Sequence, residues 1–169
     1  PRQITFEHYA RVFADKGLQY LTNSVIVSAF TVVLSLLAGA LAAYALARYR
    51  FRGHQFLMVF TIAIMSIPIA SLLVPTFTLL STIGLINTRL GLVLLYTAYQ
   101  LPLVIWMLYG YFLSLPVEVE NAARIDGYGA LGTLRRIVLP LSKPGLVAAA
   151  LFVVVFSWND FVVALTMTS

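Results

Sequence analysis

The sequence has 169 residues, of which 61% are hydrophobic and only 10% are charged, with a formal net charge of +5. An average soluble domain carries about 25% charged residues, so eleven basic and six acidic residues are too few to cover a water-soluble protein of this size. Cysteine is absent, which excludes disulfides and thiolate metal sites. The positive charge fits basic anchors at helix ends, so we predict an all-α integral membrane protein with no nucleic-acid partner.

Long uncharged stretches predict where the chain crosses the lipid bilayer. Crossing the hydrocarbon core takes about 20 apolar residues, and continuous apolar runs favour helices over the alternating strands of a barrel. After a polar leading segment, Pro1 to Gly17, four spans are expected. They run from Tyr20 to Ala47, from Gln55 to Ser81, from Leu90 to Leu115 and from Gly145 to Leu165.

Small residues and prolines give the spans local features. Ser35, Gly39, Ala43 and Ala47 recur at every fourth position of the first span, which predicts close packing against a neighbouring helix. Prolines free a carbonyl and bend a helix, so the second and third spans should be interrupted or bent. The prolines concerned are Pro68, Pro75 and Pro102.

Basic residues in the loops predict the orientation. One side, formed by a short turn at 48–54 and a polar stretch at 116–144, holds seven: Arg48, Arg50, Arg52, Arg124, Arg135, Arg136 and Lys143. The other side, formed by the leading segment and a short turn at 83–89, holds four: Arg2, Arg11, Lys16 and Arg89. Because short cytoplasmic loops are enriched in Lys and Arg, the first side should be cytoplasmic and both chain ends should lie outside.

The polar stretch at 116–144 should contain a short helix. Pro116 suits a helix start, and Glu118 and Glu120 would fall in the first turn, where the helix dipole favours negative charge. Gly127 can take the left-handed conformation that ends many helices. We therefore predict a helix of about three turns up to Asp126.

One face of this predicted helix is small and weakly apolar. Val119, Ala122 and Ala123 share it at the i, i+3, i+4 spacing. Alanines present little bulk, so this face suits docking into a cleft on another protein.

The same stretch carries a spaced motif. Its residues are Asn121, Ala122, Ala123, Gly127, Ile137, Leu139 and Pro140. The spacing resembles the "EAA" signature of permease subunits of binding-protein-dependent ABC importers. With Pro116, Glu118 and Asp126 it is most similar to the carbohydrate branch, the maltose-type permeases. The likeness extends from about Phe6 onward, and other matching segments are 20–24, 42–48, 51–53 and 158–161.

The resemblance implies a type I ABC importer permease fold. Residues 1–169 would form a single transmembrane domain with a coupling loop at 116–144. Family members usually have six membrane helices, so the first and last would be missing here. The sequence departs from the family at Asn121, where Glu is usual, so this position lacks a charge that could pair with an ATPase.

The implied function is ATP-driven import of a carbohydrate or polyol across a prokaryotic inner membrane. The expected partners are a dimer of ABC ATPases, a second permease and an extracytoplasmic substrate-binding protein. This chain would be no enzyme and would hold no cofactor, because ATP and Mg²⁺ belong to the ATPase. The implied coupling residues are Glu118, Asn121, Ala122, Ala123, Arg124, Asp126, Gly127, Ile137, Leu139 and Pro140.

Polar residues at membrane depth are the candidates for the translocation pathway: Ser66, Ser71, Gln100, Asn159 and Asp160. Each neutral one more often bonds to a neighbouring helix than to a substrate. Asp160 is the only charge inside a span. It lies about 25 Å from Lys143 along a helix, close to the outer interface, so capping a helix is as good an explanation as touching substrate.

Other function classes have weaker support. Gly127, Gly129 and Gly132 fit a dinucleotide-binding pattern but lack a preceding strand and an acid near the expected position. His8 and His54 lie in loops, so an intramembrane hydrolase or His-ligated metal site has no base or ligand in the bilayer. An importer of amino acids, peptides or phosphate is one alternative. An ion-coupled transporter is another, although the second and third spans contain no carboxylate.

Overall fold

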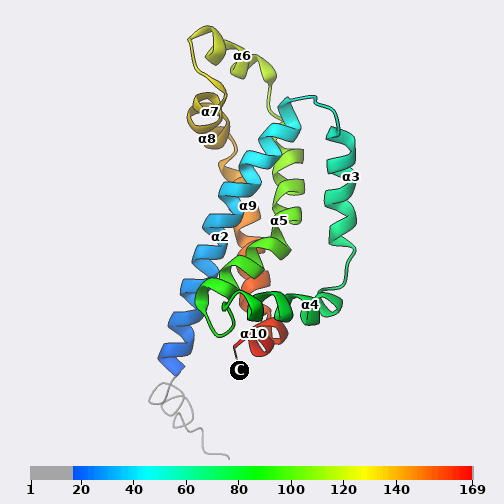
Figure 1. Cartoon of the computed structure of the whole chain (residues 1–169). Coiled ribbons are helices and arrows are strands. Elements are labelled where there is room, and N and C mark those ends of the chain that lie inside the picture. Colours follow the sequence, from blue (N-terminus) through cyan, green and yellow to red (C-terminus); the bar gives the residue numbers. More distant parts are fainter. Residues whose placement is uncertain (1–16, 169) are drawn as a thin grey trace, which may run out of the picture.

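The computed structural model describes residues 17–168, and every regular element in that range is helical (Figure 1). The predicted leading segment, with His8, Arg2, Arg11 and Lys16, lies outside the described residues. The longer helices are α2 (Gly17–Arg48), α3 (His54–Met65), α4 (Ile69–Thr82), α5 (Arg89–Leu113), α6 (Val117–Ile125) and α9 (Lys143–Asn159). The shorter ones are α7 (Ala130–Thr133), the π-helical turn η1 (Leu134–Val138), α8 (Leu139–Leu141) and α10 (Phe161–Met167).

Three long helices, α2, α5 and α9, run side by side and form the centre of the molecule (Figure 1). Their contact surfaces are lined by small and branched residues, among them Ala43, Val104, Ala149 and Val153, all fully buried. A Cβ added at Gly39 would lie 2.5 Å from Cγ1 of Val104 on α5. The small-residue face predicted for the first span is therefore a close helix–helix contact.

The first and third spans are confirmed as continuous helices, since α2 and α5 are both long and apolar enough to cross a membrane. The second span is broken: α3 and α4 meet at 99°. Pro68 is the cause, because it lacks an N–H and disfavours helical geometry at the residue before it. Pro75 and Pro102, by contrast, lie inside α4 and α5.

The prediction of one continuous fourth span, from Gly145 to Leu165, is wrong. Helix α9 ends at Asn159, Asp160 is extended (ψ 97°), and α10 starts at Phe161. The Asp160 carboxylate accepts a hydrogen bond from the backbone N–H of Val163 at 3.0 Å. This side-chain cap stabilises a new helix start, so the chain turns instead of continuing.

A second bend lies before α9, where the helical stretch 130–141 meets α9 at 81°. The described chain thus has two helices that could cross a membrane alone, and up to four spans if each bent pair counts as one.

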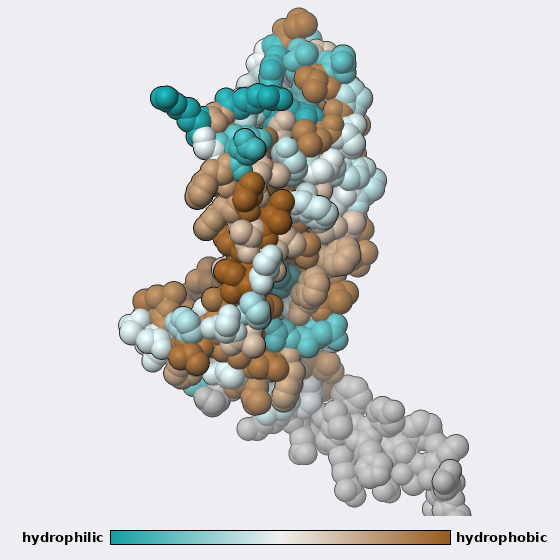
Figure 2. Space-filling view, turned by 90° about the vertical axis from the view of Figure 1, so that its right-hand side faces the viewer, coloured by the Kyte–Doolittle hydropathy of each residue, from teal (hydrophilic) through white to brown (hydrophobic). Residues whose placement is uncertain are grey.

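Both basic loops lie at one end of the molecule, together with α6, while α4, α10 and the C-terminus lie at the other (Figure 1). On the face shown in Figure 2, strongly hydrophobic side chains gather around the middle, and hydrophilic ones project near the α6 end. The loops at 48–54 and 116–144 are therefore on the same side, as the charge pattern predicted.

Candidate functional site

Helix α6 begins and ends where the sequence predicted. Pro116 precedes it in an extended conformation and Asp126 follows it as the C-cap. Gly127 has φ 88°, and its N–H donates to the Arg124 carbonyl at 3.0 Å. The N–H of Tyr128 donates to the Ala123 carbonyl at 3.0 Å. These two bonds form a Schellman motif, which favours glycine at the left-handed position.

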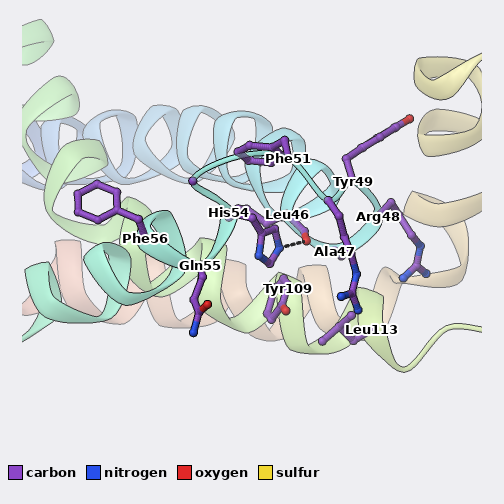
Figure 3. A pocket seen from close by; sticks show the side chains of 12 residues that line it. Leu46, Ala47, Arg48, Tyr49, Phe51, His54, Gln55, Phe56, Tyr109 and Leu113 are labelled. Atoms are coloured by element: carbon purple, nitrogen blue, oxygen red, sulfur yellow. Dashed lines mark hydrogen bonds between the residues drawn. The ribbon is translucent and has the colours of Figure 1, made fainter.

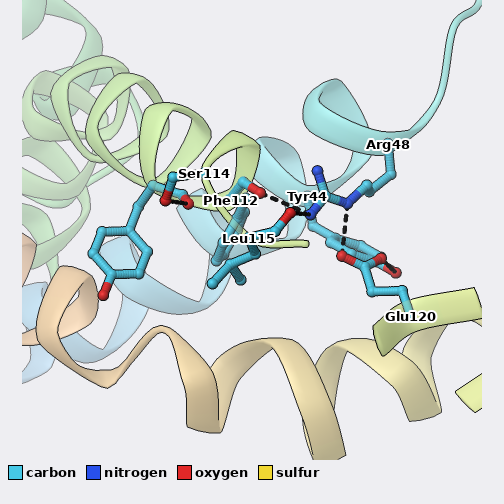
Figure 4. A network of polar contacts seen from close by, with 7 residues as sticks. Tyr44, Arg48, Phe112, Ser114, Leu115 and Glu120 are labelled. Atoms are coloured by element: carbon cyan, nitrogen blue, oxygen red, sulfur yellow. Dashed lines mark hydrogen bonds and ion pairs between the residues drawn. The ribbon is translucent and has the colours of Figure 1, made fainter. Parts of the chain in front are cut away.

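The inner face of α6 is buried against its own chain. Glu120 is 2% exposed and Ala123 is 3% exposed. The Glu120 carboxylate accepts hydrogen bonds from Nε of Arg48 at 2.6 Å and from the Tyr44 hydroxyl at 3.0 Å (Figure 4). A buried carboxylate is stable only when it is paired and hydrogen-bonded, and both oxygens of Glu120 have a partner.

Arg48 also binds the end of α5. Its Nη2 donates to the carbonyl of Phe112 at 2.7 Å and to that of Leu115 at 3.4 Å (Figure 4). The Tyr44 ring packs edge-on against Phe112, with centroids 6.3 Å apart. The ends of α2 and α5 and the first turns of α6 therefore meet at one buried polar cluster, which we call the Arg48 cluster (Tyr44, Arg48 and Glu120).

The outer face of α6 is free in the described part of the chain. Its exposed residues, spaced i, i+3, i+4 and i+7, are Glu118, Asn121, Ala122 and Ile125. Ile125 is 87% exposed and, with Leu131 at 68%, leaves apolar surface in a polar region. A small, partly apolar helix face of this kind is suited to a groove on another protein.

The other predicted coupling residues lie around this face or behind it. Arg124, Asp126, Gly127 and Pro140 are exposed, and Ile137 and Leu139 are half-buried in η1 and α8. Ala123 differs from the prediction: it packs inside the chain, so Ala122 alone of the pair is accessible. The predicted face of Val119, Ala122 and Ala123 is therefore split between two sides of α6.

Sequence reasoning missed the Arg48 cluster. The sequence alone explains Glu120 by the helix dipole and Arg48 as part of the basic turn. Tyr44 and Arg48 share one face of a helix at the i, i+4 spacing. Their partner lies 72 residues further along the chain from Arg48, and no local signal in the sequence specifies that pairing.

The pathway candidates do not form one polar group. Ser71 donates to the Pro68 carbonyl at 2.7 Å, and Nδ2 of Asn159 donates to the Val155 carbonyl at 2.8 Å, so both bond within their own segment. Ser66 is exposed at the end of α3. Gln100 is 7% exposed, and its Oε1 accepts no hydrogen bond within residues 17–168. Asp160 caps α10, which agrees with the capping explanation.

A cavity of about 550 Å³ lies beside the Arg48 cluster, between the end of α2, the start of α3 and the end of α5 (Figure 3). Its lining mixes basic and aromatic residues, including Arg50, Phe56 and Tyr109. The ring of His54 fixes one wall, because its Nε2 lies 2.7 Å from the Leu46 carbonyl and donates to it. None of the five pathway candidates lines this cavity.

Comparison with known proteins identifies the family. Residues 35–169 match the model of the binding-protein-dependent transport system inner membrane component. The chain belongs to this family. The α6 loop that carries the motif lies within the matched residues, and the predicted membrane localisation is confirmed with the family.

Curated relatives of this permease family include several named for sugars. The trehalose transport system permease protein SugB of Mycobacterium tuberculosis is 38% identical over the whole chain and 62% of the relative. The diacetylchitobiose uptake system permease protein NgcG of Streptomyces coelicolor is 38% identical, and the match covers 100% of this chain and 56% of the relative. The trehalose/maltose transport system permease protein MalG of Thermococcus litoralis is 37% identical, and the match covers 98% of this chain and 60% of the relative.

The fold agrees with a solved transporter. A crystal structure of a bacterial ABC transporter involved in the import of the acidic polysaccharide alginate matches with a TM-score of 0.84 and 30% identity. The match covers 100% of this chain and 59% of the chain in that structure. The predicted all-α permease fold is confirmed, and the chain spans about three-fifths of the relatives it matches.

Proposed function

We propose that this chain is part of the membrane-spanning permease subunit of an ATP-driven importer, and that the cargo is a carbohydrate or polyol. The names of three relatives at 37–38% identity, for trehalose, diacetylchitobiose and trehalose/maltose, support this cargo class. The solved transporter of similar fold is involved in importing a polysaccharide.

The observation that carries the proposal is the two-sided character of α6. Its inner face is fixed to the membrane helices through Glu120, and its outer face is exposed beyond the end of the bundle. A short helix of this length is not stable by itself. Fixing it at the end of a bundle while leaving one face free suits transmission of a movement from a partner.

The proposed partners follow from this geometry and from the family. Two copies of an ATPase would bind ATP and Mg²⁺ and contact α6 from the cytoplasm. A second permease would complete the pathway, and an extracytoplasmic binding protein would deliver the cargo. In this proposal the chain holds no cofactor, catalyses no reaction and belongs to one transmembrane domain.

An ion-coupled mechanism is disfavoured by the placement of acidic groups. Helices α3, α4 and α5 contain no Asp or Glu, and the carboxylate of Asp160 is already used as the cap of α10. A coupling ion near the bilayer midplane would use carboxylate oxygens or unwound carbonyls, and the second span offers only carbonyls, at its break between α3 and α4.

The test is co-purification of the full-length protein in mild detergent. We expect a nucleotide-binding subunit in two copies and a second permease, and we expect the cognate binding protein to retain a saccharide. Recovery of the protein alone, with uptake that persists without ATP but collapses with the ion gradient, would refute the ATPase coupling. A binding protein that retains an amino acid, peptide or phosphate would refute the cargo class.

A further inference from the structure

The Arg48 cluster joins three elements at one buried point, and this arrangement has a mechanical consequence. Arg48 holds α6 through Glu120, and it also holds the Phe112 carbonyl in the last turn of α5 and the Leu115 carbonyl in the linker that follows. The linker between α5 and α6, residues 114–116, is therefore bridged on both sides by one guanidinium group. Without that bridge the linker would be a natural hinge.

We propose that the Arg48 cluster makes α6 and the adjoining ends of α2 and α5 a single rigid body, so that displacement of α6 by a partner is passed directly to these membrane helices. This inference rests on the proposed function for its partner, but the rigidity itself is a property of this chain. Tyr44, Arg48 and Glu120 are then positioning residues of the coupling step.

The chemistry of arginine suits this role. The planar guanidinium presents donors in a fixed fork, whereas the lysine ammonium is a point charge on a flexible stem. Arg48 uses Nε for the carboxylate and Nη2 for the backbone carbonyls, which fixes two directions at once. Tyr44 occupies the second oxygen of Glu120, so the carboxylate cannot rotate without breaking a buried bond.

A simpler explanation is that the cluster only compensates the buried charge of Glu120. In that case its loss would lower thermal stability without changing the relative motion of α6 and α2. The two explanations therefore predict different results for the distance between these helices.

The experiment measures that distance in the assembled full-length transporter by pulsed EPR, with spin labels on cysteines at Leu41 of α2 and Val119 of α6. Both side chains are exposed, at 53% and 40%, and the sequence contains no cysteine. We expect one narrow distance distribution that is the same with and without Mg²⁺ and a non-hydrolysable ATP analogue.

Two variants weaken the cluster in graded steps. Arg48→Lys keeps the positive charge but loses the planar arrangement of guanidinium donors. Tyr44→Phe loses only the hydroxyl that binds Glu120. We expect Arg48→Lys to broaden the distribution about twofold and Tyr44→Phe to broaden it less, with the ATPase still attached because the outer face of α6 is unchanged. The matched controls Arg52→Lys and Tyr20→Phe change exposed residues outside the cluster and should leave the distribution narrow.

The proposal is overturned if the native distance shifts when nucleotide binds, or if both variants keep the native width while only their melting temperature falls. Should Arg48→Lys fail to fold, Tyr44→Phe decides. Absence of the ATPase from the native preparation would refute the proposed function instead. The widths of the distance distributions measured on the permease alone would still show whether α6 and the ends of α2 and α5 form one rigid body.

Discussion

At the scale of single residues, Glu120 is the most unusual feature of the loop end of the molecule. It carries a carboxylate that is 2% exposed, at the first turn of a nine-residue helix. Arg48 and Tyr44 together satisfy both of its oxygens. Removing one partner of a buried pair leaves an uncompensated charge, which costs more than the pair contributes when it is intact.

Truncation of the two neighbouring glutamates should therefore have very different effects. Glu120→Ala should lower the free energy of unfolding by about 3–5 kcal/mol, because it leaves Arg48 buried and unpaired. Glu118→Ala, on the exposed side of the same turn, should change it by less than about 0.5 kcal/mol. Thermal unfolding of the detergent-solubilised protein compares them, and equal melting temperatures would contradict the burial of Glu120.

Gly127 is the second residue with a specific requirement. Its φ of 88° is in the left-handed region, which costs a non-glycine residue about 1–2 kcal/mol. Gly127→Val should therefore displace the end of α6 and reduce ATPase recovery while membrane insertion stays normal. Gly84→Val imposes the same strain (φ 70°) at the other end of the molecule and is the matched control. Native ATPase recovery with Gly127→Val would show that this turn does not position the contact.

At the scale of helices, the close approach of α2 and α5 organises the bundle. The absence of a side chain at Gly39 lets Val104 pack directly against the α2 backbone. Most association between membrane helices depends on such contacts, because lipid supplies no hydrophobic force between them.

An added methyl group tests this contact. Gly39→Ala should destabilise the protein, because its Cβ would overlap Val104, and Val104→Ala should restore much of the loss in the double variant. Gly110→Ala on α5 is the matched control, since a Cβ there meets nothing within 4 Å in the described chain. Melting temperatures of the native protein, the two single variants and the double variant form the cycle, and additive losses would contradict the contact.

Local signals predicted much of this architecture from the sequence. Apolar runs predicted α2 and α5, Pro116 and Gly127 predicted the limits of α6, and Pro68 predicted the break between α3 and α4. Each of these features depends on neighbouring residues in the chain. The break at Asp160 also has a local cause, a side-chain cap, but an apolar run on both sides concealed it.

The sequence did not predict which residues of distant segments contact each other. Ala122 and Ala123 are identical in the motif, and only the docking of α6 against α2 and α5 decides which one is exposed. The pairing of Arg48 with Glu120 likewise depends on how α2 and α5 end beside each other. A single sequence carries no record of such distant contacts.

At the scale of the whole molecule, the two ends differ in character. One end gathers the basic loops, the Arg48 cluster and the exposed face of α6, and the other holds α4, α10 and the C-terminus (Figure 1). The excess of basic residues at the first end predicts that it faces the cytoplasm. In the proposed function, the ATPase would contact the permease at this end.

Photo-crosslinking from Ile125 in native membranes tests the central claim most directly. Ile125 is the most exposed apolar residue of α6, and a crosslinker placed there should attach to a nucleotide-binding subunit. The same crosslinker at Leu37, which is 59% exposed in the middle of α2, should attach to lipid or other membrane segments. If Ile125 attaches only to lipid or to its own chain while the ATPase is present in the complex, α6 is not the coupling element.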